Sequence, residues 1–185
     1  MPGRNLVAAH DAFIEPIKAS LSVLGTLHLQ HSPKVRSDAA AEHSWTINKG
    51  EGISLGQLRF KAQMTFRYRR DETLPDTPWR VRTTAYMYTI EKKNGREVLA
   101  WHWQPAAPGP KEPHLHVGAG VLAPGEILSS KDHVPTGRVA VEEVVRMLIR
   151  ELDVKPGNES WAEQLAGTEQ KFRAFSSWGT LSPPT

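Results

Sequence analysis

The segment from about Leu55 to Arg69 constrains the fold more than any other part of this sequence. Apolar and polar residues alternate along it, and most of the polar ones are basic. Because successive side chains of a β-strand point to opposite faces of a sheet, the alternation predicts a strand with one core face and one basic face. The apolar positions are Leu58, Phe60, Ala62, Met64, Phe66 and Tyr68, which alternate with Arg59, Lys61, Gln63, Thr65, Arg67 and Arg69.

Further strands are expected on both sides of this one. Residues 79–92 and 96–104 have strand character, and the dipeptide Asn94–Gly95 lies between them. That dipeptide predicts a tight hairpin with a type I′ turn, in which both central residues need positive φ. Residues 114–121 predict another strand, whereas residues 31–52 predict a loop with at most a short strand around residues 45–47.

Helices are predicted near both ends of the chain. Apolar residues recur at spacings of three, four and seven between residues 5 and 29, which is typical of an amphipathic helix. Pro16 lies in its middle, so we expect a kink or two helices that meet near Glu15. Residues 138–153 follow the helical spacing closely, and Ser160 is a suitable cap for a last helix that ends near Phe175.

This order of elements predicts an α+β fold in a single domain of residues 1–185. We expect an N-terminal helical segment in residues 1–30, an antiparallel sheet in residues 53–122 and C-terminal helices in residues 138–176. The sheet is predicted to be a meander of three to five strands, with the helices packed on one face. Such packing buries the apolar face and leaves the basic face in solvent.

Composition excludes several classes of protein and of site. The 185 residues include no cysteine, so disulfides, thiolate zinc sites and a cysteine nucleophile are excluded, and a metal ion would need histidine and carboxylate ligands. No apolar run approaches the roughly 18 residues of a membrane span, and the first residues do not resemble a secretory signal. We therefore expect a cytoplasmic protein without a membrane partner.

The basic residues are unevenly distributed. Between Arg59 and Arg96 there are ten basic and four acidic residues, although the net charge of the chain is only +3. Guanidinium groups on a rigid surface suit phosphate recognition, so this face is a candidate site for nucleic acid, RNA more than DNA. The alternative is a solvated face that nearby carboxylates partly neutralise. The candidate nucleic-acid-binding residues are Arg59, Lys61, Arg67, Arg69, Arg80, Arg82 and Arg138.

Histidines cluster in the second half of the sequence. His114 and His116 would share one face of a strand, and His133 follows within twenty residues. Imidazoles can act as acid and base in phosphodiester cleavage, so His114, His116 and His133 are the candidate catalytic residues of an enzyme that needs no metal. Alternatively, the same three residues could bind a divalent metal ion, or they could be a half-exposed polar face. His102 would join this group if its neighbours Trp101 and Trp103 are in the core.

The region from about residue 86 to residue 152 resembles the small TumE-like toxin proteins of bacterial toxin-antitoxin pairs. The resemblance lies in the aromatic strands Ala85–Tyr88 and Leu99–Trp103, the motif Pro113-His114-Leu115-His116, and the Val-Glu-Glu-Val-Val pattern of residues 141–145. It implies a small intracellular protein that is encoded beside an antitoxin-like partner and acts on nucleic acid or its metabolism.

The leading prediction is therefore a toxin-like or RNA-processing protein. It would bind a phosphate backbone on its basic sheet face and use the histidine cluster for ribonuclease-like chemistry. Two alternatives stay open, namely a non-enzymatic module that binds nucleic acid or a protein partner, and a metal-dependent enzyme with histidine ligands.

Overall fold

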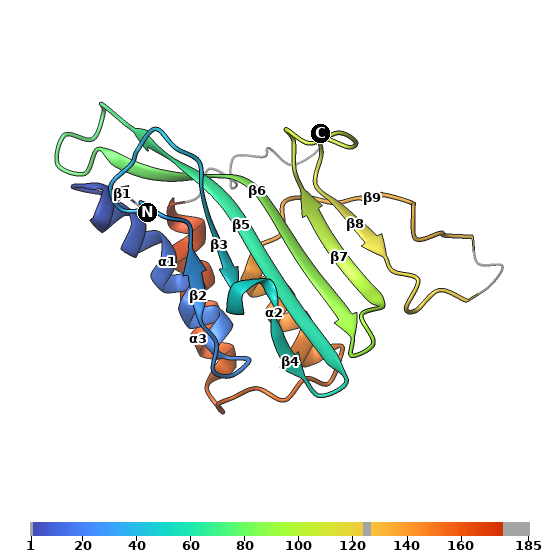
Figure 1. The fold of residues 1–185 in the computed structure, drawn as a ribbon. Coiled ribbons are helices and arrows are strands. Elements are labelled where there is room, and N and C mark those ends of the chain that lie inside the picture. The colour runs from blue at the N-terminus through green and yellow to red at the C-terminus, as the bar shows by residue number, and fades with distance from the viewer. Residues whose placement is uncertain (1, 124–126, 176–185) are drawn as a thin grey trace, which may run out of the picture.

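A large antiparallel sheet with three α-helices on one side forms the structure (Figure 1). The computed structural model describes residues 2–123 and 127–175. The α+β prediction is confirmed. The elements are β1 (Pro2–Gly3), α1 (Leu6–Ser22), β2 (Leu29–His31), β3 (His43–Ile47), the short 3-10 helix η1 (Asn48–Gly50), β4 (Ile53–Leu55), β5 (Leu58–Arg70), β6 (Trp79–Lys92), β7 (Glu97–Trp103), β8 (His114–Val117), β9 (Val134–Pro135), α2 (Val141–Arg150) and α3 (Trp161–Phe175).

The sheet has nine strands in the described residues, so the predicted three to five strands are wrong. The main path runs β2-β3-β5-β6-β7-β8-β9, while β1 pairs with β6 and β4 pairs with β5. The extra strands are short. Most of β3 matches the short strand expected around residues 45–47, whereas β2 and β4 lie at the ends of the segment predicted as loop. β3 and β4 pair with the long strand β5, and β2 pairs with β3, which local sequence cannot reveal.

The strand β5 confirms the alternation that opened the sequence analysis. Phe60 and Phe66 are fully buried, whereas Arg67 and Arg69 on the alternate positions are partly or largely exposed. Its partner β6 runs beside it along its whole length, with an irregularity between Thr65 and Phe66. Such a bulge increases the local twist of a strand pair.

The hairpin between β6 and β7 lies where it was predicted, but its turn differs. Of the two turn residues, only Gly95 has positive φ, at 80°, so the type I′ turn is wrong. The Gly95 N–H donates to the Lys92 carbonyl at 2.9 Å, and the register shifts between Ile90 and Glu91. This combination is typical of a longer hairpin loop in which glycine supplies the left-handed residue at a bulge.

Helix α1 is continuous from Leu6 to Ser22 and contains Pro16. The alternative of two helices that meet near Glu15 is therefore wrong. Asn5 caps the helix, because its side-chain oxygen accepts from the Ala8 N–H at 2.8 Å. The proline removes one helical hydrogen bond, and its buried ring contributes apolar contact with the rest of the protein instead.

The C-terminal helices match their predictions within a few residues. The N–H of Ala140, just before α2, donates to the Glu143 carboxylate at 3.0 Å, which satisfies a backbone group at the helix start. Val144 and Leu148 of α2 and Leu165 of α3 are buried. Residue 176, the predicted end of this helical segment, lies outside the described residues. In the part of the chain that is described, no helix has the length and apolar character needed to span a membrane.

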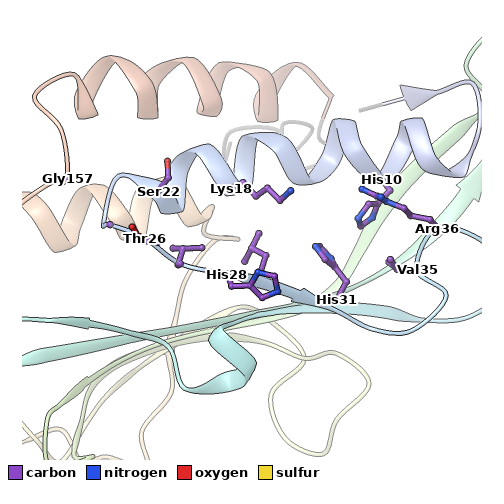
Figure 2. Close-up of a pocket in the computed structure, with 12 residues that line it drawn as sticks. His10, Lys18, Ser22, Thr26, His28, His31, Val35, Arg36 and Gly157 are labelled. Atoms are coloured by element: carbon purple, nitrogen blue, oxygen red, sulfur yellow. The ribbon is translucent and has the colours of Figure 1, made fainter.

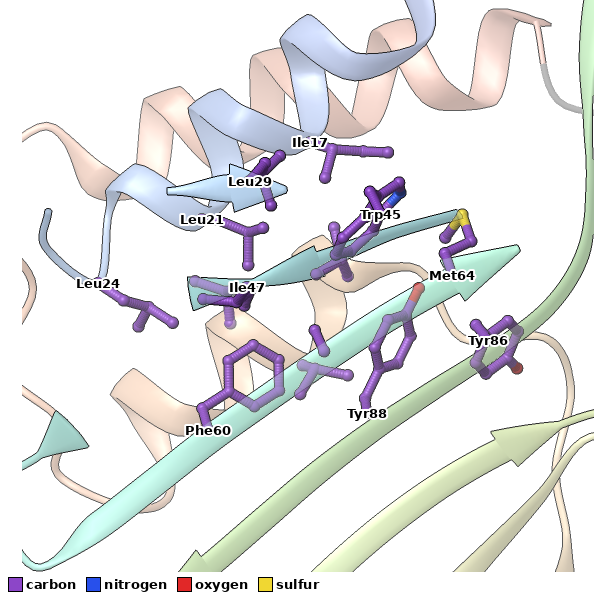
Figure 3. Close-up of a cluster of buried hydrophobic side chains, with 14 of the residues drawn as sticks. Ile17, Leu21, Leu24, Leu29, Trp45, Ile47, Phe60, Met64, Tyr86 and Tyr88 are labelled. Carbon is purple, nitrogen blue, oxygen red and sulfur yellow. The ribbon is translucent and has the colours of Figure 1, made fainter. Parts of the chain in front are cut away.

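The core lies between the helices and one face of the sheet. Figure 3 shows Ile17 and Leu21 of α1 above Trp45, Phe60 and Tyr88 of the sheet. Trp101 and Trp103 of β7 belong to the same core and are 8% and 7% exposed. Because side chains alternate along β7, His102 between them points to the opposite face, away from the helices.

Candidate metal centre

Three adjacent strands bring four histidines together. In the pairing of β7 with β8, His102 lies opposite His114, and Ala100 lies opposite His116. In the pairing of β8 with β9, Leu115 lies opposite Val134, which places His133 beside His116 at the start of β9. Residues far apart in the sequence therefore meet on neighbouring strands (Figure 1). The structure brings together all three predicted catalytic histidines.

His102 joins them, as expected if Trp101 and Trp103 are in the core, although it was not among the candidate catalytic residues. The signal was present in the sequence as the pattern Trp101-His102-Trp103, which puts His102 on the cluster's face once the tryptophans are buried. Sequence alone could not decide which residues of β7 face the core, because both tryptophan and histidine occur on half-buried surfaces.

The histidine cluster, defined here as His102, His114, His116 and His133, is compact. One ring nitrogen from each of His102, His114 and His116 can be chosen so that all three lie within 4.8 Å of one another. The ring centroids of His102 lie 5.7 Å from His114 and 4.8 Å from His116, and those of His114 and His116 are 5.0 Å apart. His133 lies 4.8 Å from His114 and 4.5 Å from His116, again between centroids.

Exposure increases across the cluster. His114 is 7% exposed, His102 and His116 are half-buried, and His133 is exposed. A metal ion held by the first three would therefore have His133 and solvent on its open side.

Hydrogen bonding identifies the nitrogen that His114 can offer. Its Nδ1 lies 2.8 Å from the backbone carbonyl of Glu112, an arrangement in which the ring N–H donates. That bond leaves Nε2 as the acceptor, and metal-binding histidines commonly fix their second nitrogen in this way. The Nε2 of His102 is buried and has no hydrogen-bond partner in the described part of the chain. A bound cation would satisfy such a nitrogen, which otherwise costs about 1–3 kcal/mol.

The electrostatics keep these rings neutral. The pKa of His102 is lowered to about 4, first by burial and then by the nearby His116, His114 and His133. Burial also lowers the pKa of His116, with His133 and His114 as additional causes. Neutral imidazole is the form that binds metal ions, so at neutral pH both rings are ready to coordinate one.

The nitrogens of the cluster are farther apart than those of an occupied zinc site. Ligand nitrogens of a tetrahedral zinc site are about 3.3 Å apart, given Zn–N distances of about 2.0–2.1 Å, so rings whose nitrogens lie within 4.8 Å of one another would have to move closer by up to about 1.5 Å. Of the three predicted catalytic histidines, His116 has a lowered pKa, which disfavours a role as general acid near neutral pH.

Carboxylates lie close to several of the seven predicted nucleic-acid-binding residues. Glu91 pairs with Lys61 at 2.8 Å and lies 3.9 Å from Arg59, near one end of β5. Arg67 pairs with Glu42 at 3.3 Å and Arg80 with Asp71 at 3.1 Å, towards the other end. Three carboxylates thus lie beside four of the seven cations, with Glu91 shared by Arg59 and Lys61.

Four of the seven line a single cavity of about 820 Å³ between the sheet and the helices. They are Arg69, Arg80, Arg82 and Arg138. The guanidinium of Arg138 lies 3.7 Å from the ring centre of Trp103, a cation–π contact. The inner wall is apolar and includes Met64 and Tyr88. None of the four histidines of the cluster lines this cavity.

No protein-family model, no curated protein and no solved structure matches this chain, so its function is inferred from the residues of the site.

Proposed function

We propose that His102, His114 and His116 bind a divalent transition-metal ion, and that the protein is a metal-dependent enzyme that hydrolyses phosphate esters of nucleic acid. The observation that carries the proposal is the approach of three ring nitrogens to within 4.8 Å on adjacent strands. Three imidazole ligands with an open side are typical of catalytic rather than structural zinc sites. The absence of cysteine is compatible with such a ligand set.

The chain's own residues have distinct roles in this proposal. A divalent ion at such a site polarises a phosphoryl oxygen and makes water more acidic. His114 is the best-fixed ligand, because it is buried and its Nδ1 is held by the Glu112 carbonyl. His133, at the exposed end, is positioned to accept a proton from the attacking water.

Phosphorylated polymers are the proposed substrate class because four of the predicted phosphate-binding arginines line one cavity, which shares no residue with the histidine cluster. Arg69 and Arg82 are exposed and have no carboxylate partner among the described residues, so both are available to phosphate oxygens. RNA is the proposed nucleic acid rather than DNA, and the resemblance to TumE-like toxins implies an antitoxin-like protein as partner.

The activity test uses tag-free protein, a short single-stranded RNA and bis(p-nitrophenyl) phosphate. After treatment with EDTA, we expect hydrolysis to stop and to return on addition of Zn²⁺, Mn²⁺ or Co²⁺. His116→Ala should lose at least about a hundredfold in rate, since it removes a ligand. Thr89→Ala is the matched control, because Thr89 lies opposite Ala100 in the neighbouring strand and offers no ligand.

Two other outcomes of the activity test would contradict the proposed metal-dependent mechanism. Activity that survives EDTA but disappears in His116→Ala would favour the metal-free acid–base mechanism of His114, His116 and His133. Hydrolysis at the parental rate in His116→Ala would show that the histidine cluster is not the site.

A binding experiment tests the substrate class separately. Arg82→Gln should weaken binding of the RNA several-fold and lessen its dependence on salt, whereas Arg59→Gln should leave both nearly unchanged, since Arg59 lies beside Glu91. Equal effects of the two substitutions would contradict this assignment of the phosphate-binding residues.

A further inference from the structure

A second cavity of about 820 Å³ lies on the other side of the molecule from β7 and β8, between α1 and the segment that includes β2. Figure 2 shows that α1 supplies one wall and that residues 25–36 supply the other. Its lining residues include His10, Lys18, His31 and Arg36. None of them belongs to the candidate metal centre.

The polar part of this lining consists of cations, imidazoles and hydroxyls. Lys18 and Arg36 are the cations, and no carboxylate is among the lining residues. Lys18 makes a loose pair with Glu15 at 3.6 Å, and both side chains are largely exposed. Asp11 pairs with only the Nη2 of Arg36, at 2.6 Å, so other donors of the guanidinium stay available within the described residues.

Two imidazoles face one another across the cavity. Figure 2 shows His10 on α1 and His31 on β2 pointing toward each other, and their ring centroids are 4.9 Å apart. His10 is 1% exposed. The Nδ1 atoms of both rings are buried and have no hydrogen-bond partner in the described part of the chain. Buried nitrogens without partners are uncommon and mark a place where a ligand group can bind.

The charged groups that act on the two rings are mainly cationic. The pKa of His10 is lowered to about 4, first by burial and then by His31, Arg36 and Lys18, opposed by Asp11. The pKa of His31 is lowered by burial and then by Lys18, Arg36 and His28, again opposed by Asp11. The same positive potential that disfavours an imidazolium stabilises an anion.

We propose that this cavity binds the phosphate group of a small phosphorylated molecule. Lys18 and Arg36 would supply the charge, and His10 and His31 would supply N–H donors to the phosphate oxygens. The apolar side chains of Leu27, Leu29 and Val35 in the same lining suit the uncharged part of such a molecule. The volume exceeds that of a phosphate ion alone, which favours a phosphate monoester.

Calorimetry at low salt tests this proposal in the presence of EDTA, so that any metal at the histidine cluster is absent and the result is independent of the proposed enzymatic function. The probes are inorganic phosphate, adenosine 5′-monophosphate and adenosine. We expect the monophosphate to bind and adenosine not to bind. Equal binding of inorganic phosphate would identify the free ion as the ligand, whereas weaker binding would identify a monoester.

Substitutions locate the binding to this cavity. Lys18→Met should weaken binding of the monophosphate about tenfold or more, because a hydrogen bond to a charged group is lost. Lys93→Met, on an exposed hairpin away from the cavity, should bind like the parent. Ring ¹⁵N signals of His10 and His31 should shift when the monophosphate is added.

Two results would overturn the proposal. One is the absence of binding of both phosphate probes at millimolar concentration. The other is parental affinity in Lys18→Met together with unshifted ring signals of His10, which would place any binding elsewhere.

Discussion

His102 is the residue on which the metal centre depends most, because it is half-buried and its Nε2 has no partner among the described residues. A protein of ordinary stability tolerates few such groups, since each removes a noticeable part of a net stability of about 5–15 kcal/mol. A nitrogen of this kind beside two other imidazoles is explained if a cation binds between them.

The pH dependence of stability tests the state of His102. Its pKa is about 4 in the folded, metal-free protein and about 6.5 when unfolded. Between these values the unfolded chain binds more protons, so the contribution of His102 to stability is lost as pH falls from 6.5 towards 4. As pH falls over this range, the free energy of unfolding of the parent should therefore decrease by about 1–3 kcal/mol more than that of His102→Gln. Urea unfolding in the presence of EDTA measures both.

Thr89→Ala serves as the control in the same experiment. Its free energy of unfolding should differ from that of the parent by the same amount at every pH. A difference between parent and His102→Gln that does not change with pH would mean that His102 is already solvated in the folded protein.

The pair of strands β7 and β8 holds the histidine cluster in place. Two glycines just after β8 allow the chain to lie close to the backbone of β7. A Cβ on Gly118 would lie 2.1 Å from the Glu97 carbonyl oxygen, and one on Gly120 would lie 2.4 Å from it. Their N–H groups donate to Val98 and Glu97, each at 2.8 Å. The end of β8 is therefore fixed against β7.

Gly118→Ala should disturb this pairing. We expect a loss of at least about 2 kcal/mol in the free energy of unfolding, together with weaker metal binding, because β8 must move away from β7. Gly137→Ala is the matched control, since nothing lies within 4 Å of its added Cβ and its φ is not positive. Melting curves and a metal titration of both variants provide the measurement. If Gly118→Ala had the melting temperature and the metal affinity of the parent, the close contact of Gly118 with Glu97 would be contradicted.

The three helices meet at a buried polar group. The Ser20 hydroxyl lies 2.9 Å from a Glu142 oxygen, 2.8 Å from the Thr168 hydroxyl and 2.8 Å from the Pro16 carbonyl. Glu142 is 2% exposed, and burial raises the pKa of its carboxyl group. Because a hydroxyl has a single hydrogen, Ser20 can donate to Pro16 and still accept from a protonated Glu142.

Glu142→Gln should therefore stabilise the protein at high pH. A raised pKa means that the folded state holds the proton more tightly, so stability is lost as pH rises above about 4.5, the ordinary value. The glutamine variant avoids this loss, and its melting temperature should exceed that of the parent at pH 8 by more than at pH 4. Glu163→Gln on the exposed side of α3 should show no such change. A lower melting temperature for Glu142→Gln at pH 8 would indicate a buried carboxylate.

The local pattern of apolar and polar residues was sufficient to predict most of the long strands and helices. The strands β5, β6 and β7 and the helices α2 and α3 begin and end close to their predicted bounds, because periodicity over ten or more residues is a strong signal. The short strands β2 and β4 could not be predicted in this way, since three residues carry no period and their pairing with β3 and β5 creates them. The turn at Gly95 was predicted in place but not in type, because the bulge depends on register.

The candidate site was predictable in part for the same reason. The spacing of His114 and His116 is local, so their shared face follows from strand geometry. The approach of His133 and His102 depends on the pairing of β8 with both neighbours, which is a tertiary property. The pair of Arg80 with Asp71 matches the alternative of a face that nearby carboxylates partly neutralise. Glu42, the partner of Arg67, comes from another segment of the chain and could not be predicted from local sequence.

At the scale of the whole molecule, the sheet separates two kinds of surface. One face packs against the helices and carries the apolar core, while the other carries the histidine cluster. The cavity beside α1 lies on the helix side, at the β2 edge of the sheet, and shares no residue with the histidine cluster. A metal ion and a phosphate group could therefore bind at the same time without sharing a residue.

Titration of the tag-free, EDTA-treated protein with Co²⁺, followed by absorption spectroscopy, is the most direct test of the metal centre. Imidazole ligands in a site of low coordination number give visible d–d bands, and we predict saturation at one equivalent per chain. His114→Ala and His116→Ala should lose the bands, whereas Thr89→Ala should retain them. If the parent shows no bands up to millimolar Co²⁺, or if either histidine variant binds like the parent, the histidine cluster is not a metal site.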